Sequence, residues 1–142
     1  MSVFILRGEH GGSYSPPAAT GTVFSDVSVS TPFAKWMEQF AHEGISTGCA
    51  AGSPPPYCPT GSVTRNAMAK FLLLGKHGSS FSPPAATGTV FGDVSVSTFL
   101  AKWMEELFHE GITTGCGGGN YCPLGTVTRG EMAKFIKATF GL

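Results

Sequence analysis

The sequence predicts a mostly α-helical protein made of tandem two-helix repeats, with long ordered connectors rich in Pro and Gly and one disulfide loop per repeat. Three observations lead to this fold class. They are a long internal repeat, apolar residues spaced as on one face of a helix, and four cysteines in two matching pairs. With 142 residues, of which 42% are hydrophobic, the chain is long enough to form one or two small packed domains.

The internal repeat covers most of the chain. Residues 10–50 align with residues 77–117 without a gap, and 31 of these 41 positions are identical. The match resumes after a loop that is three residues shorter in the second copy, so that residues 57–65 align with 121–129. Self-similarity of this kind is typical of proteins built from repeated structural units.

The register of the repeat predicts three segments. Residues 1–6 align with residues 68–73, which belong to the last helix of a repeat. We therefore expect residues 1–21 to be the terminal helix and connector of a truncated repeat. The first full repeat with its connector then covers residues 22–87, and the second covers residues 88–142.

Apolar residues at positions i, i+3, i+4, i+7 and i+8 predict one amphipathic helix near the start of each repeat. These residues are Phe33, Trp36, Met37, Phe40 and Ala41 in the first repeat, and Leu100, Trp103, Met104, Leu107 and Phe108 in the second. Thr31 is expected to cap the first of these helices, with Pro32 directly after the cap. Gly44 and Gly111 are expected to end the two helices in a left-handed conformation.

A second helix is expected to begin after Thr64 in the first repeat and after Thr128 in the second. Thr128 and Glu131 have the spacing of a capping box, in which each side chain accepts a hydrogen bond from a free backbone N–H. Ala67 stands at the Glu position in the first repeat, which weakens that cap by about 0.5–1 kcal/mol. Short helices are marginal alone, so both helices of a repeat must pack on neighbours.

The segments 10–25 and 77–92 are expected to be ordered connectors. Paired prolines at 16–17 and 83–84 favour extended backbone. Aromatic residues recur in register along both segments and are expected to anchor them to the core. These are Tyr14 and Phe24 in the first segment and Phe81 and Phe91 in the second.

The cysteines form two matching pairs, Cys49 with Cys58 and Cys116 with Cys122. We expect one local disulfide per repeat, which removes about 2–2.7 kcal/mol of chain entropy from the unfolded state. Disulfides indicate an oxidising compartment. The alternatives are a metal site and free thiols, but zinc ribbons use shorter spacings than these unequal gaps.

Three short motifs recur in the same order in both repeats. The first is F-x-D-V, the second is G-I-x-x-G, and the third begins with T-R at the start of the second helix. They fall at residues 24–27 and 91–94, at 44–48 and 111–115, and at 64–65 and 128–129. In this combination they resemble the S-layer-homology repeat, and the resemblance covers nearly the whole chain.

The resemblance implies a helical module, commonly three repeats around a pseudo-threefold axis, that attaches to cell-wall or cell-surface polysaccharide in grooves between repeats. The Arg of the family's T-R-x-E motif is its main ligand contact. The resemblance therefore implies that Arg65 and Arg129 bind the glycan, together with Thr64, Thr128 and Glu131. The residues alone leave a second interpretation open, in which both arginines are first-turn residues that face solvent or pair with a nearby carboxylate.

Two further pairs of repeated residues have alternative roles. Trp36 and Trp103 lie on the apolar helix faces, which favours a place in the core over stacking on sugars. Asp26 and Asp93 supply one carboxylate per repeat, too few ligands for a dedicated calcium site. Hydrogen bonding in a cap or turn is the expected role of these aspartates.

Composition and motifs argue against several functions. Nine basic and nine acidic residues balance, so there is no long-range attraction for nucleic acid or an anionic membrane. No stretch is long enough for membrane insertion. The four histidines, at 10, 42, 77 and 109, repeat in register as structural residues do, and no nucleophile elbow, phosphate loop or H-E-x-x-H motif occurs. We expect no catalytic residue, cofactor or metal.

The sequence supports two functions at an extracellular cell surface. The first is a structural or anchoring module that binds polysaccharide. The alternative is a subunit that binds copies of itself head-to-tail through its N-terminal segment, a contact that builds filaments or sheets because it does not close. The residues expected at that contact are Phe4, His10, Tyr14, Pro16 and Pro17. A third possibility is a fragment of a longer repeat array.

Overall fold

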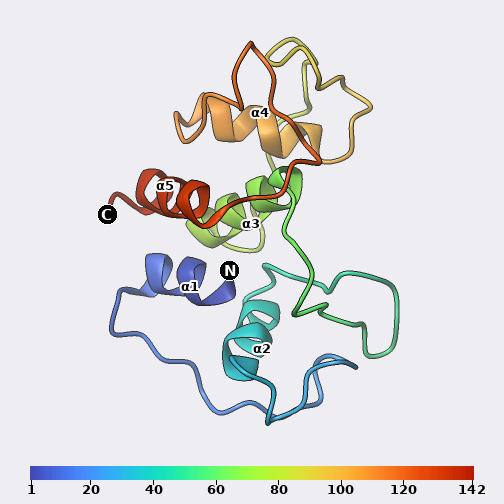
Figure 1. Ribbon diagram of the computed structural model, residues 1–142, viewed down its shortest axis with the longest axis vertical. Helices are drawn as coiled ribbons and strands as arrows, with labels where there is room; N and C mark the ends of the chain where they lie inside the picture. The colour runs from blue at the N-terminus through green and yellow to red at the C-terminus, as the bar shows by residue number, and fades with distance from the viewer. The chain divides into compact units, whose positions relative to one another are not determined.

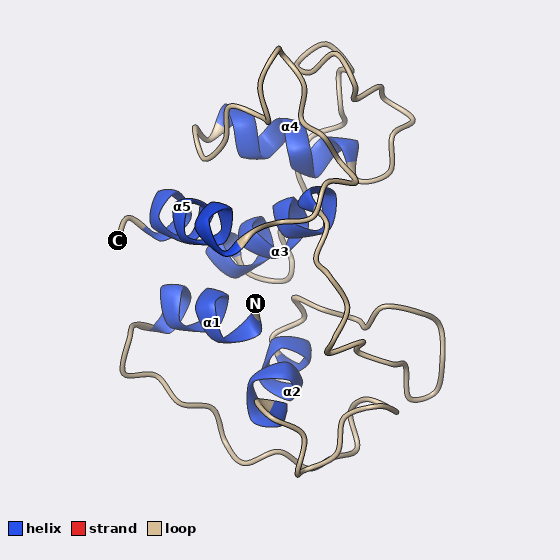
Figure 2. Ribbon diagram, viewed as in Figure 1, coloured by secondary structure: helices blue, strands red, loops and turns tan.

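The computed structural model describes residues 1–142 and is mostly helical, as predicted (Figure 1). Figure 2 shows that long loops join the helices and that no β-strand is present. The helices are α1 (Ser2–His10), α2 (Ala34–His42), α3 (Arg65–His77), α4 (Ala101–His109) and α5 (Arg129–Phe140).

The contacts divide the chain into two compact units, unit 1 (Met1–Gly61) and unit 2 (Ser62–Leu142). In unit 1, α1 packs on α2, and in unit 2, α3 packs on both α4 and α5. The boundary lies between the first cysteine loop and α3, inside the first sequence repeat. Each unit therefore begins with the last helix of one sequence repeat, α1 or α3. That helix packs on the first helix of the following repeat, α2 or α4.

Helices α2 and α4 begin in the same unusual way, after a residue with left-handed backbone. Phe33 and Leu100 precede the two helices, each with φ of 64°. The predicted Thr31 cap is wrong, because α2 begins only at Ala34 and the Thr31 hydroxyl accepts a hydrogen bond from the Ser28 N–H at 2.9 Å. Phe33 is also not part of the buried helix face. It lies outside the helix and is 64% exposed.

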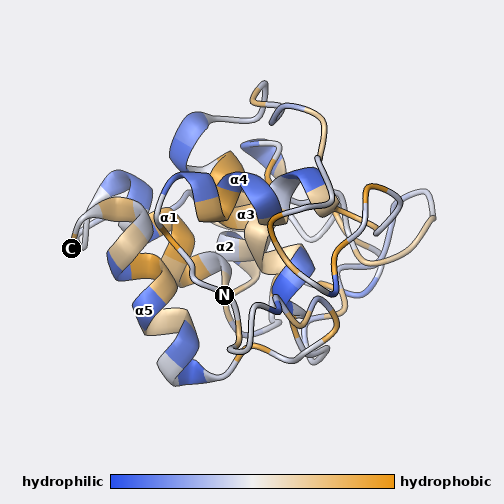
Figure 3. Cartoon of the chain, turned by 90° about the horizontal axis from the view of Figure 1, so that it is seen from above, coloured by the Kyte–Doolittle hydropathy of each residue, from blue (hydrophilic) through white to orange (hydrophobic).

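The rest of the predicted apolar faces is largely buried. Trp36, Met37 and Phe40 are buried in unit 1, and Trp103, Met104 and Leu107 are buried in unit 2. Phe108 is an exception, since it is 41% exposed. Colouring by hydropathy shows apolar and polar residues on different sides of the helices (Figure 3).

Both amphipathic helices end as the sequence predicts. Gly44 has a left-handed backbone with φ of 70°, and its N–H donates to the Ala41 carbonyl at 2.8 Å. The next N–H, of Ile45, donates to the Phe40 carbonyl at 3.1 Å. This pair of bonds is a Schellman motif. The same pair of bonds forms at Gly111 and at the residue that follows it.

The starts of α3 and α5 also follow the prediction. Thr128 and Glu131 form the predicted capping box, with the Glu131 N–H donating to the Thr128 hydroxyl and the Thr128 N–H to the Glu131 carboxylate. At α3 the Asn66 side-chain oxygen accepts from the Ala67 N–H at 2.7 Å instead.

The segments before α2 and α4 have no regular secondary structure, and aromatic side chains of these segments pack on the units. Tyr14 meets Trp36 edge-to-face at 6.0 Å between ring centroids, and Phe81 meets Trp103 in the same way at 6.1 Å. Phe24 belongs to the core cluster of unit 1, with Val27, Ala34 and Met37.

Candidate functional site

The disulfides form as predicted. Cys49 is bonded to Cys58 and Cys116 to Cys122, with 6.0 Å between the Cα atoms in each pair, and no cysteine is free. Each disulfide closes the loop that follows the first helix of its repeat. All four thiols are thus used in the expected structural role.

The aspartates of the F-x-D-V motifs hold these loops in place. The Asp93 carboxylate accepts hydrogen bonds from the Tyr121 and Cys122 N–H groups at 2.7 and 2.8 Å. Asp26 accepts from the corresponding N–H groups in unit 1 at the same distances. Desolvation alone would raise the pKa of Asp26, but hydrogen bonds from backbone N–H groups, including those of Tyr57 and Cys58, outweigh it and lower the pKa. A hydrogen-bonding role is confirmed, but the bonds reach a loop 28–32 residues further along the chain and are not those of the local cap or turn that the sequence predicted.

Two buried glutamates are structural residues that the sequence analysis missed. Glu38 and Glu105 are each only 2% exposed. The Glu105 carboxylate accepts from the Thr87 and Gly88 N–H groups, each at 2.7 Å, and from the Thr87 hydroxyl. Desolvation would raise the pKa of Glu105, but these hydrogen bonds outweigh it and lower the pKa. The sequence feature that could have indicated this role is the T-G-T triplet that recurs at residues 20–22 and 87–89 and supplies the hydrogen-bond donors.

Arg65 is buried inside unit 2, where it joins α3 to the second cysteine loop and to α5. Its Nε donates to the Tyr121 carbonyl at 2.8 Å, and its Nη1 donates to Glu131 Oε1 at 2.7 Å. The guanidinium carbon lies 5.2 Å from the centroid of the Tyr121 ring and 5.5 Å from that of Phe135. For Arg65 this geometry is that of a first-turn residue paired with a nearby carboxylate, the second interpretation that the sequence left open.

The other residues of the T-R-x-E motifs have different surroundings. Arg129 and Thr128 are exposed at the start of α5. Glu131 contacts both Thr128 and Arg65; the hydrogen bonds from Thr128 and the positive charge of Arg65 lower its pKa. The Thr64 hydroxyl donates to Asn66. The structure thus brings Arg65, Thr128 and Glu131 together and leaves Arg129 at the surface.

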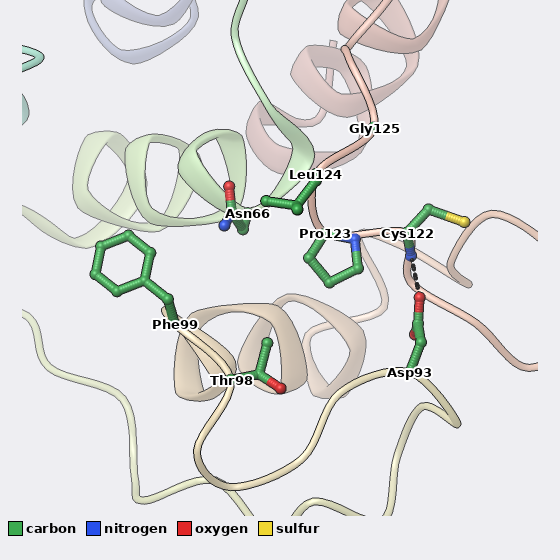
Figure 4. A pocket seen from close by; sticks show the side chains of 8 residues that line it. All are labelled: Asn66, Asp93, Thr98, Phe99, Cys122, Pro123, Leu124 and Gly125. Carbon is green, nitrogen blue, oxygen red and sulfur yellow. Dashed lines mark hydrogen bonds between the residues drawn. The ribbon is translucent and has the colours of Figure 1, made fainter.

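An open pocket of about 530 Å³ lies in unit 2 where the start of α3, the start of α4 and the second cysteine loop meet (Figure 4). In Figure 4 the side chains of Phe99 and Thr98 lie on the α4 side, opposite those of Asn66 and Leu124. The lining residues are Asn66, Asp93, Thr98, Phe99, Cys122, Pro123, Leu124 and Gly125.

The two large apolar side chains of this pocket are strongly exposed. Phe99 is 76% exposed and Leu124 is 80% exposed. The first repeat has Pro32 and Thr60 at the corresponding positions, whereas Thr98 and Pro123 are unchanged between the repeats. The second repeat therefore places two apolar groups at this pocket that the repeat fold does not require.

The five residues expected at a contact between copies of the chain differ in their exposure and in their partners. His10 Nε2 lies 3.0 Å from Glu43 Oε1, and the His10 ring lies 4.3 Å from the Tyr14 ring between centroids. Pro16 is buried, whereas Pro17 and Phe4 are exposed. His10, Tyr14 and Pro16 therefore have their contacts within the chain itself.

Comparison with known proteins finds no family model that matches the chain and no significant match among curated proteins. None of the helices is both long and apolar enough to cross a membrane.

Proposed function

We propose that this chain is an extracellular, non-enzymatic module of the S-layer-homology type that binds cell-wall or cell-surface polysaccharide. The pocket of unit 2, with its exposed Phe99 and Leu124, is the observation that carries the proposal. The two disulfides suit an oxidising, extracellular setting. The recurring F-x-D-V, G-I-x-x-G and T-R motifs support the family assignment.

The chemistry of the pocket suits a sugar. Ligand pockets combine apolar walls with a few polar groups that fix orientation, and their volumes of about 300–1,000 Å³ include this one. Phe99 and Leu124 offer apolar surface for the C–H face of a sugar ring. The Thr98 hydroxyl and the amide nitrogen of Asn66, whose side-chain oxygen already accepts from Thr64 and Ala67, offer polar groups for its hydroxyls.

The lining also indicates the charge of the glycan. Neither Lys nor Arg lines the pocket, and Asp93 is its one ionisable residue. Arg65, the family's expected ligand contact, is 4% exposed and already paired with Glu131. We therefore assign the contact to Phe99 and Leu124 and expect a neutral polysaccharide segment.

A retention assay on purified cell-wall sacculi tests this proposal. The double variant F99P/L124T carries the residues that the first repeat has at these two positions, so the repeat fold accommodates both. We expect its retention to be at least tenfold weaker, because it removes the apolar walls of the pocket. V96T changes a side chain that is 66% exposed outside the pocket and is the matched control. Equal retention of F99P/L124T and the wild type would contradict the proposal.

R129A locates the contact independently, because Arg129 is exposed at the start of α5 and does not line the pocket. We expect this variant to be retained as well as the wild type. Loss of retention in R129A alone would move the site from the pocket to the start of α5.

Head-to-tail assembly is the second candidate, and the 53% exposure of Phe4 on α1 is the observation that favours it. A polar substitution, F4S, removes that apolar group and keeps α1. Electron microscopy and the particle mass in solution provide the test. Polymers that form in the wild type and disappear in F4S would support assembly through this helix, whereas a monomeric wild type would exclude it.

A further inference from the structure

The last turn of the first helix differs between the two units in two charged positions, since unit 1 has Arg7 and Glu9 where unit 2 has Leu74 and Lys76. In unit 2, Lys76 Nζ lies 2.8 Å from Glu110 Oε2, and His77 Nε2 lies 2.7 Å from Glu110 Oε1. Both oxygens of this carboxylate therefore have a partner. Desolvation would raise the pKa of Glu110, but Lys76 and His77 outweigh it and lower the pKa.

Unit 1 has the same histidine and glutamate but a second carboxylate in place of the lysine. Glu9 is the residue that corresponds to Lys76, and it lies beside His10 and Glu43. Glu43 Oε1 is hydrogen-bonded to His10 and to Gln39, whereas Glu43 Oε2 is buried with no hydrogen-bond partner. Unit 1 thus has no ammonium group beside Glu43, and the guanidinium of its additional basic residue, Arg7, lies over the Trp36 ring at 5.2 Å from the centroid.

The surroundings of this cluster are also more polar in unit 1. Tyr14 brings a hydroxyl group to the place where unit 2 has Phe81. Two carboxylates and one imidazole therefore lie together in unit 1, beside a tyrosine hydroxyl and without the lysine that unit 2 has.

We propose that Glu9, His10 and Glu43 bind a divalent transition-metal ion of the zinc class, which takes the place that Lys76 has in unit 2. One imidazole nitrogen and two carboxylate oxygens are ligands that zinc accepts, with water completing the coordination. Calcium fits poorly, because it needs six to eight oxygen ligands.

The spacing of the three groups suits one small ion. Ligand atoms at about 2.0–2.1 Å from a tetrahedral zinc lie roughly 3.4 Å from one another. His10 Nε2 lies 3.0 Å from Glu43 Oε1 and 3.8 Å from Glu9 Oε2, and the three ligand atoms are all within 4.8 Å of one another. Because Glu9 and His10 end α1 and Glu43 follows α2, the ion would link these helices.

Calorimetric titration of chelator-treated full-length protein with ZnCl₂ tests the proposal. We expect the wild type to bind one ion per chain and its melting temperature to rise on binding. E9K, which copies the lysine of unit 2, should bind at least tenfold more weakly and melt at the same temperature with or without zinc. E106Q removes a carboxylate that lies 3.8 Å from His109, outside the cluster, and is expected to bind as the wild type does.

A gain-of-function variant makes the test independent of folding defects. K76E/F81Y gives unit 2 the second carboxylate and the tyrosine of the unit 1 cluster and is expected to bind two ions per chain. A single ion in that variant, no zinc binding in the wild type, or undiminished binding in E9K would overturn the assignment. If the wild type does not bind zinc and the E9Q variant is more stable than the wild type, the two carboxylates of Glu9 and Glu43 share a proton and do not bind a metal ion.

Discussion

Arg65 and Glu131 are joined by a hydrogen-bonded ion pair of 2.7 Å that connects the first residue of α3 to the first turn of α5. The Arg65 side chain is 5% exposed and the Glu131 side chain is 38% exposed. The pair therefore lies at the edge of the interior, with its cation buried and its anion partly in water.

Replacing Glu131 with Gln is expected to destabilise unit 2 by about 1–3 kcal/mol, because the buried guanidinium then lacks its carboxylate partner. R129A changes an exposed residue of the same motif and is expected to alter the free energy of unfolding by less than about 0.5 kcal/mol. Urea denaturation of both variants measures the difference. Equal stability of E131Q and R129A would show that the ion pair contributes nothing.

The buried glutamates predict loss of stability in acid. Hydrogen bonds from the backbone and from Thr20 and Thr87 outweigh desolvation and lower the pKa values of Glu38 and Glu105 below the usual 4.5. A lowered folded-state pKa gives stability that is present above about pH 4.5 and is lost as the pH falls through the folded-state pKa.

Thermal unfolding between pH 7 and pH 3 measures this effect. E105Q cannot ionise, so its melting temperature should be lower than that of the wild type at pH 7 and should fall less on acidification. A parallel pH profile in E105Q and the wild type would contradict the assignment.

Each disulfide is expected to stabilise its own unit. Removing one by a double Cys→Ser substitution should cost about 2–2.7 kcal/mol, because the unfolded chain regains the entropy of an open loop. Denaturation of C49S/C58S and of C116S/C122S, compared with the wild type, measures the two contributions. No change in either variant would mean that the loops are held by other contacts, such as those of Asp26 and Asp93.

Asp26 and Asp93 make the same contacts, but only Asp93 lines the pocket. Both D26N and D93N should lower stability by about 1–3 kcal/mol, because each weakens charged hydrogen bonds to two backbone N–H groups. Only D93N is expected to weaken retention on sacculi. Comparable loss of retention in D26N would separate glycan binding from the pocket of unit 2.

Local patterns in the sequence predicted the helices, the disulfides, the Gly44 ending of α2 and the Thr128–Glu131 capping box. These features depend on residues within about one or two helical turns. The left-handed backbone at Phe33 was not predictable, because an apolar residue at that spacing normally continues the helix face. The buried role of Glu38 depends on Thr20 and Gly21 in the preceding connector, which no periodicity links to the helix.

The sequence also did not predict that Arg65 is buried and Arg129 exposed, because both residues follow a threonine in the same motif. Arg65 bonds to residues 56 and 66 positions further along the chain, in the second cysteine loop and in α5. The pocket likewise needs three distant segments, and the exchange of Pro32 and Thr60 for Phe99 and Leu124 became informative only after those segments were seen together.

The most direct test of polysaccharide binding is a two-dimensional amide NMR spectrum of isotope-labelled protein, recorded with and without a soluble, purified cell-wall polysaccharide preparation. We predict shift changes grouped at Asn66, at Thr98 and Phe99, and at Leu124 and Gly125, and predict that they are absent in F99P/L124T. Shifts grouped around Arg129, or an unchanged spectrum at saturating polysaccharide, would contradict the account.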